Sequence, residues 1–161
     1  MSASVLAADN PGVLVPGGRA TARTTYGLAK SGWTVLGATG AEALIDDNPG
    51  TSWRAPAGVR EVCLDLGESV RIGALSYLPP LISRSSDGFV QLCRWYVSAT
   101  PDGWGRPVGE LRCDNVVNNP VEQRLDVTPV TGRYVRIELL DTVNNAPQAA
   151  FGGLNVYRST P

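Results

Sequence analysis

Short runs of alternating apolar and polar residues, separated by glycine and proline, are the feature that most constrains this fold. Each run has the length of a strand, is rich in β-branched or aromatic residues and is bounded by turn-forming residues. Many short strands of this kind indicate a β-sandwich or a β-barrel. The clearest runs are 61–66, 72–77, 93–98, 122–127, 134–139 and 154–157.

Only one short segment carries a helical signal. Residues 41–45 are expected to form a single turn, which the Asp-Asp-Asn-Pro-Gly sequence at 46–50 then stops. A chain of 161 residues suits one domain with a real core. We expect residues 1–18, which are rich in proline and glycine, to form a tail or an edge segment before a sandwich over 19–161.

The absence of histidine excludes several kinds of catalytic site. The sequence has no histidine, and Lys30 is its only lysine. Ser-His-Asp and Cys-His catalysis and histidine-ligated zinc are therefore excluded, and a lysine nucleophile is disfavoured. Carboxylate pairs can hydrolyse glycosides, but Asp46 and Asp47 are adjacent, and Asp87 and Asp114 have no motif around them. We therefore predict that the protein is not an enzyme.

The charge and hydropathy patterns argue against two classes of partner. The chain has 14 basic and 15 acidic residues, a net charge of -1 and no run of like charge, which disfavours a nucleic-acid partner. No apolar stretch approaches the length of a membrane span, so we expect no membrane insertion. Residues 1–8 lack the basic region of a signal peptide, and we interpret them as the start of a module excised from a longer protein.

Three segments between the runs are too long for simple hairpin turns. They span 79–88, 113–120 and 141–148, and all three are rich in asparagine, aspartate or serine. Long polar loops on a rigid sandwich are where recognition residues usually lie. We therefore expect a binding site on these loops.

Five segments, in order, resemble the discoidin (coagulation factor 5/8 C-type) superfamily. Residues 44–53 resemble its Ile-Asp-Gly turn followed by Thr-x-Trp, and 61–67 resemble its x-x-x-x-Asp-Leu-Gly strand. Residues 95–108 resemble Tyr-Val-Ser-x-Asp-Gly-x-x-Trp, and 132–137 resemble Ala-Arg-Tyr-Val-Arg-Leu. Residues 154–157 resemble the closing strand. The resemblance is greatest to the bacterial family 32-type carbohydrate-binding modules of that group.

The resemblance implies an all-β fold, an eight-stranded antiparallel jelly-roll β-sandwich of the galactose-binding-domain type. It also implies a lectin-like, non-catalytic module of a secreted or cell-surface bacterial glycoside-active enzyme. The expected partners are a glycan or polysaccharide and the domains of the parent enzyme. The family binds through loops at one end of the sandwich. The loop residues with polar groups suited to sugar hydroxyls are Arg84, Asp87, Asn115, Asn118, Asn144, Asn145 and Gln148.

A structural calcium ion in the 44–51 loop is a further implication of the resemblance. Asp46 matches the family's ligating aspartate, and calcium needs six to eight oxygen ligands. The corresponding ligands here are Leu44, Asp46, Asn48 and Thr51, largely through backbone oxygens. Gly153 stands where the family has a glutamate, which should lower the affinity. The alternative is a hydrogen-bonded Asx turn without metal.

The family's usual sugar site is incomplete in this sequence. Histidine is absent, and Pro80 occupies the place of the family's arginine, with Arg84 as the nearest substitute. Gln148 occupies the place of an aromatic residue, for which Phe89 and Phe151 are the candidate replacements, and we expect Phe151 to pack inside. A spacer, adhesion or protein–protein interaction domain without sugar affinity is therefore the second interpretation.

The remaining aromatic residues and the cysteines are expected to serve the fold. The resemblance implies that Trp33, Trp53, Trp95 and Tyr134 are core residues and that Trp104 packs over its hairpin. The cysteines at 63, 93 and 113 match no metal or redox motif, and we expect buried thiols. A disulfide is the alternative, because a hairpin whose paired positions sum to 206 places residue 93 opposite residue 113.

Overall fold

The computed structural model describes residues 30, 32–36, 40–48, 50–81 and 83–159, so the expected segment at 1–18 lies outside the described residues. Two 3-10 helices, η2 (Glu42–Leu44) and η3 (Val143–Asn145), are the only helices in the described part, and η2 lies where one helical turn was predicted. The strands are β1 (Thr34–Leu36), β2 (Trp53–Arg54), β3 (Glu61–Leu78), β4 (Val90–Ser98), β5 (Gly109–Arg112), β6 (Gln123–Thr142), β7 (Ala150–Phe151) and β8 (Gly153–Arg158).

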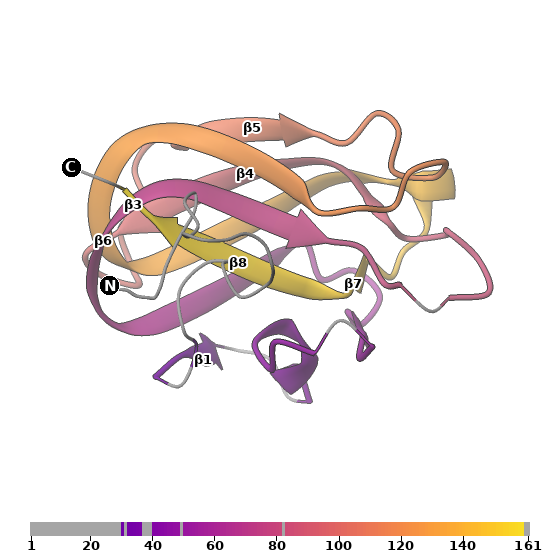
Figure 1. The fold of residues 1–161 in the computed structure, drawn as a ribbon, viewed down its shortest axis with the longest axis horizontal. Helices are drawn as coiled ribbons and strands as arrows, with labels where there is room; N and C mark the ends of the chain where they lie inside the picture. The colour runs from indigo at the N-terminus through magenta and orange to yellow at the C-terminus, as the bar shows by residue number, and fades with distance from the viewer. Residues whose placement is uncertain (1–29, 31, 37–39, 49, 82, 160–161) are drawn as a thin grey trace, which may run out of the picture.

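Two long strands, β3 and β6, contribute to both layers of the sandwich. The first half of β3 pairs with β1 and with the second half of β6, which continues through β4 to β5. The second half of β3 pairs with the first half of β6 and with β8. Figure 1 shows both long strands bending back at one end, which we call the turn end. All these strand pairs are antiparallel, which confirms the predicted all-β sandwich.

The bends join segments that the sequence pattern had separated. The predicted runs 61–66 and 72–77 are two parts of β3, and most of 122–127 belongs with 134–139 in β6. In β3 the register shifts between Asp65 and Val70. Gly67, with a φ of 82°, reverses the backbone there, because only glycine adopts this conformation at little cost.

The core lies between the two layers and is filled from alternate strand positions. Trp33 and Trp53 are buried and Trp95 is wholly enclosed, as predicted. Tyr134 is only half-buried, so its predicted place in the core was wrong. Its neighbour Val135 is buried, and because successive side chains of a strand point to opposite faces, Tyr134 lies on the outer face.

The cysteines are free thiols, as expected, and the alternative of a Cys93–Cys113 disulfide is not formed. The β4–β5 register places Cys93 opposite Leu111, because the hairpin closes with Gly109 opposite Trp95. Cys93 and Cys113 are buried as expected, whereas Cys63 is only half-buried. Burial raises the pKa of Cys113 to about 11, so this thiol stays protonated at neutral pH and acts as a small apolar group.

Candidate functional site

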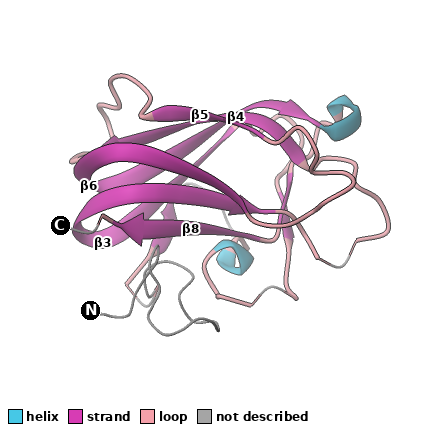
Figure 2. Cartoon of the chain, turned by 45° about the horizontal axis from the view of Figure 1, so that its top comes forward, coloured by secondary structure: helices cyan, strands magenta, loops and turns pink. Residues whose placement is uncertain are grey.

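The three predicted recognition loops leave the same end of the sandwich, opposite the bends of β3 and β6. The 79–88 loop follows β3, the 113–120 loop follows β5, and residues 143–148 follow β6. Figures 1 and 2 show these segments gathered beyond the strand ends. We call this the loop end. The chain thus collects three polar segments that are far apart in sequence.

Two of these loops are interlocked at Gly88. The Gly88 amide donates to the Val143 carbonyl at 3.1 Å, and the Val143 amide donates to the Phe89 carbonyl at 2.8 Å. The Ala150 amide donates to the Gly88 carbonyl at 2.8 Å. Gly88 has a φ of 87°, and a Cβ there would lie 2.3 Å from the Gln148 carbonyl oxygen. A close crossing of two backbones therefore requires glycine at this position.

A buried tyrosine fastens the same crossing from inside the core. The Tyr77 hydroxyl donates to the Ala150 carbonyl at 2.6 Å and accepts the Val90 amide at 3.1 Å. Burial raises the pKa of Tyr77 well above its usual range, so the hydroxyl keeps the proton that it donates. Tyr77 thereby connects β4, which follows the 79–88 loop, to β7, which follows the 143–148 segment.

An arginine fastens the crossing from the surface. Arg54 of β2 is exposed, and its Nη1 donates to the Asp87 carbonyl at 3.1 Å and to the Gln148 carbonyl at 3.5 Å. These partners lie 33 and 94 residues from Arg54 in the sequence. No local motif indicates such contacts, so neither Arg54 nor Tyr77 was predicted as a site residue.

The interlocked loops place a carboxylate beside an amide at the surface. Asn144 Nδ2 donates to Asp87 Oδ1, and both residues are exposed. Asn144 and Asn145 have φ values of 59° and 52°, in the left-handed region that asparagine tolerates better than most residues. The Thr142 hydroxyl closes this turn by donating to the Ala146 carbonyl at 2.8 Å.

The 113–120 loop is braced within itself. Asn118 Nδ2 donates to Asn115 Oδ1 at 3.2 Å, and the Asn119 amide donates to the Asn115 carbonyl at 2.8 Å. Val116 is fully buried and anchors the loop to the core. Among the described residues, no side-chain hydrogen bond joins this loop to the other two.

The predicted ligand-binding residues therefore fall into separate groups. Asp87 and Asn144 form one pair, Asn145 follows Asn144 in the chain, and the Gln148 carbonyl accepts from Arg54. Asn115 and Asn118 form their own pair in the 113–120 loop. Arg84 is exposed and forms no hydrogen bond or ion pair with another described residue.

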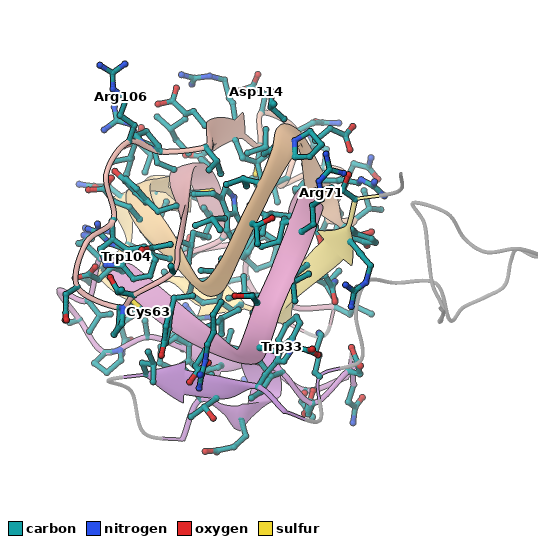
Figure 3. The ribbon with its side chains drawn as sticks, turned by 90° about the vertical axis from the view of Figure 1, so that its left-hand side faces the viewer. Trp33, Cys63, Arg71, Trp104, Arg106 and Asp114 are labelled. Atoms are coloured by element: carbon teal, nitrogen blue, oxygen red, sulfur yellow. The ribbon has the colours of Figure 1, made fainter. Side chains whose placement is uncertain are left out.

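No aromatic side chain of these loops is available to stack on a ligand. Phe151 is fully buried, as expected, and packs against Trp53 and Tyr77 with 5.6 Å between ring centroids in each pair. Phe89 is only 4% exposed, so it does not replace the missing aromatic residue. Figure 3, viewed from the turn end, shows the half-buried Trp104 on the hairpin between β4 and β5, away from the loop end.

Comparison with known proteins identifies the family. Residues 20–151 match the F5/8 type C domain. This chain belongs to that family. No curated protein sequence matches the domain significantly.

Solved structures show the same fold for this F5/8 type C domain. CpGH89CBM32-5 from Clostridium perfringens, in complex with GalNAc-β-1,3-galactose, has a TM-score of 0.69 and 21% identity over 81% of this chain and 98% of that chain. The family 32 CBM from C. perfringens NanJ, in complex with galactose, has a TM-score of 0.65 and 18% identity over 81% and 97%. The C-terminal domain of a chitobiase from Bacteroides fragilis has a TM-score of 0.67 and 23% identity over 82% and 97%.

The 46–51 turn of this F5/8 type C domain is closed by its own hydrogen bonds. Asp46 Oδ1 accepts the Asn48 amide at 2.9 Å, and Asp46 Oδ2 accepts the Thr51 hydroxyl at 2.6 Å. Across the described residues, no three side chains of histidine, cysteine, aspartate or glutamate come together as metal ligands. With a single carboxylate whose oxygens are already bonded, the donor set fits an Asx turn better than a calcium cage.

The position of Gly153 explains what the turn lacks. A Cβ on Gly153 would lie 3.9 Å from the Leu44 carbonyl, one of the predicted calcium ligands, with no closer neighbour. A carboxylate carried by residue 153 would therefore lie beside the predicted ligands. Lys30 Nζ lies 2.9 Å from Asp47 Oδ1, and its positive charge further opposes a bound cation in this turn. Calcium binding stays a prediction for this domain.

The helices in the described part of the chain are too short and too polar for a membrane crossing.

Proposed function

We propose that this F5/8 type C domain is a non-catalytic carbohydrate-binding module that takes a glycan at its loop end. The Asp87–Asn144 pair carries the proposal, because it presents a carboxylate and an amide at the surface from two interlocked loops. Similar solved folds hold GalNAc-β-1,3-galactose, galactose or 4,5-unsaturated mannuronic acid, which supports a sugar ligand.

The chemistry of the pair suits neighbouring sugar hydroxyls. A carboxylate accepts hydrogen bonds on two oxygens, and an amide both donates and accepts, so together they can bind two adjacent hydroxyl groups. The backbone crossing at Gly88 holds the pair in place before a ligand arrives, which lowers the entropy that binding costs. We expect weak binding at a single exposed site and a large gain from multivalent display.

A parent enzyme that acts on glycosides is part of the same proposal. The fold matches the C-terminal domain of a bacterial chitobiase, which supports attachment to such an enzyme and a secreted or cell-surface location. The near-neutral chain, with 14 basic and 15 acidic residues, gives no support to a nucleic-acid partner. Membrane insertion is likewise not part of the proposal.

A spacer or protein-interaction domain is the second candidate, and one observation favours it. The loop end presents exposed Leu81 and Val117 (54% and 46% exposed), while Phe89 and Phe151 are buried. Sugar recognition usually uses an aromatic face. Aliphatic side chains without such a face suit a protein surface better.

A multivalent glycan array tests the first candidate against the second. The expected result is a reproducible glycan hit for wild type that Asp87→Ala weakens about tenfold or more, as loss of one or two hydrogen bonds predicts. Asn115→Ala is the matched control, because its partner Asn118 lies in the same loop, and it should keep wild-type binding. A blank array from folded protein would reject the carbohydrate proposal and favour the spacer. Equal losses for both variants would place the glycan across all three loops.

A further inference from the structure

We propose that Arg54 is the positioning residue of the loop end: its guanidinium holds the two interlocked loops in the arrangement that brings Asp87 to Asn144. The consequence for ligand binding rests on the proposed function, whereas the effect on the loops rests on geometry alone. Arg54 lies outside all three recognition loops, so neither their composition nor their spacing indicates this role.

The strand pairing fixes the backbone from which Arg54 reaches. β2 pairs with β7, and this register places Arg54 opposite Ala150, two residues after Gln148. The Ala55 amide also donates to the Ala149 carbonyl at 2.8 Å. The Arg54 side chain therefore starts beside the end of the 143–148 segment, and it has only to span the crossing to reach the 79–88 loop.

One nitrogen of Arg54 contacts both loops at the crossing. Nη1 lies 3.1 Å from the Asp87 carbonyl oxygen and 3.5 Å from the Gln148 carbonyl oxygen. A Cβ on Gly88 would lie 2.9 Å from the same nitrogen. Because residue 88 has no side chain, the Gln148 backbone and the Arg54 guanidinium can both lie against it.

The contact acts at the residue that presents the carboxylate. Arg54 donates to the backbone carbonyl of Asp87, whereas the Asp87 carboxylate accepts its hydrogen bond from Asn144. Charge-assisted hydrogen bonds are roughly twice as strong as neutral ones. A lysine has one compact ammonium group in place of the planar guanidinium, so it can restore part of this contact and not all of it.

Amide hydrogen exchange, followed by NMR in the whole domain, tests the positioning role without any ligand. The reporters are the amides of Gly88, Val143 and Ala150, which form the crossing. We expect Arg54→Ala to speed their exchange about tenfold, and Arg54→Lys to speed it less. Arg84→Ala is the matched control, an exposed arginine that forms no hydrogen bond or ion pair with another described residue, and it should leave exchange unchanged.

A core amide separates a local effect from general destabilisation. The Val135 amide lies in the centre of β6, and its exchange should be the same in wild type and Arg54→Ala. Unchanged exchange at the three crossing amides in Arg54→Ala would overturn the proposal. An equal rise at Val135 would also overturn it, because Arg54 would then stabilise the fold as a whole.

The binding arm uses the glycan found on the array. Arg54→Ala should weaken its binding about tenfold, and Arg54→Lys should recover part of the loss. Arg106→Ala, at an exposed arginine of the hairpin between β4 and β5, should keep wild-type affinity. Unaltered affinity in Arg54→Ala, despite faster exchange, would overturn the role of Arg54 in the site. If wild type binds no glycan, the proposed function fails, and the exchange arm still decides whether Arg54 positions the loops.

Discussion

Each end of the sandwich contains a glycine with a positive φ that lies against a backbone carbonyl, but the two glycines have different roles. At the loop end, Gly88 has a φ of 87°, and a Cβ there would lie 2.3 Å from a carbonyl oxygen of the other loop. At the turn end, Gly67 has a φ of 82°, and a Cβ would lie 2.6 Å from the Gly32 carbonyl oxygen. The first crossing brings loop side chains together, whereas the second reverses a strand. A crowded glycine therefore does not by itself mark a binding site.

The carboxylates beside these glycines show what distinguishes the two ends. At the turn end, Asp65 accepts the Gly67 amide at 2.8 Å and two Arg133 nitrogens at 2.7 and 3.0 Å. At the loop end, the Asp87 carboxylate accepts a bond from Asn144 at Oδ1, and no other described residue donates to it. Asp65 is thus satisfied within the fold, while Asp87 keeps acceptor capacity for a ligand.

Alanine substitution of each glycine gives the largest expected effects and tests the difference between the two ends. Gly88→Ala and Gly67→Ala should each lower the free energy of unfolding by about 3 kcal/mol, through backbone strain and displacement of a packed carbonyl. Gly88→Ala should also abolish glycan binding, whereas Gly67→Ala should retain it. Urea unfolding and titration with the array ligand measure the two effects.

Gly58→Ala is the control for the backbone conformation alone. Gly58 has a φ of 86°, and a Cβ there would meet nothing within 4 Å. This variant should lose about 1 kcal/mol, the cost of a left-handed conformation without a clash. A loss as large as that of Gly88→Ala would show that φ alone, and not the crossing, sets the requirement for glycine.

Loss of the Tyr77 hydroxyl tests the inner fastening of the loop end. Tyr77→Phe leaves the buried Ala150 carbonyl and Val90 amide without this partner, so we expect a loss of about 1–3 kcal/mol in unfolding free energy. Tyr96→Phe removes a hydroxyl that donates to Glu138 on the outer face, and it should cost less. Similar losses for the two variants would contradict a special role for Tyr77.

Restoring a carboxylate at residue 153 tests the turn that leads into β2 and Arg54. Gly153→Glu should gain stabilisation by calcium, about 1.4 kcal/mol at ten times the dissociation constant. Wild type should respond less, because Asp46 is the only carboxylate among its predicted ligands. Thermal unfolding with calcium and with a chelator measures both responses. An equal calcium response in wild type would show that the 46–51 turn needs no second carboxylate.

The smallest expected effect concerns pH at the turn end. The hydrogen bonds from Arg133 hold the pKa of Asp65 below its usual range. The stabilisation is present above the ordinary aspartate pKa of about 3.9 and is lost as pH falls through the lower folded value. Wild type should therefore lose up to about 1 kcal/mol more than Asp65→Asn between pH 5 and 2, by urea unfolding. Parallel pH profiles would show that this ion pair contributes nothing.

The sequence determined the strands and the loops of this protein, because period-two alternation and turn residues act locally. The runs at 61–66, 93–98 and 154–157 all lie in strands, and the three polar loops all lie at one end. The continuity of β3 and β6 through their bends was not predicted. Alternation leaves open which face of a strand points inward, and the family resemblance placed Tyr134 on the wrong face, because Val135 fills the core instead.

Which polar loop residues come into contact depends on the tertiary structure. Asp87 and Asn144 come together because the backbones cross at Gly88, and Asn115 stays apart because its loop folds on itself. Arg54 reaches partners 33 and 94 residues away. Contacts over such separations depend on how strands pack and on the space left by a missing side chain, and no local pattern of residues encodes either.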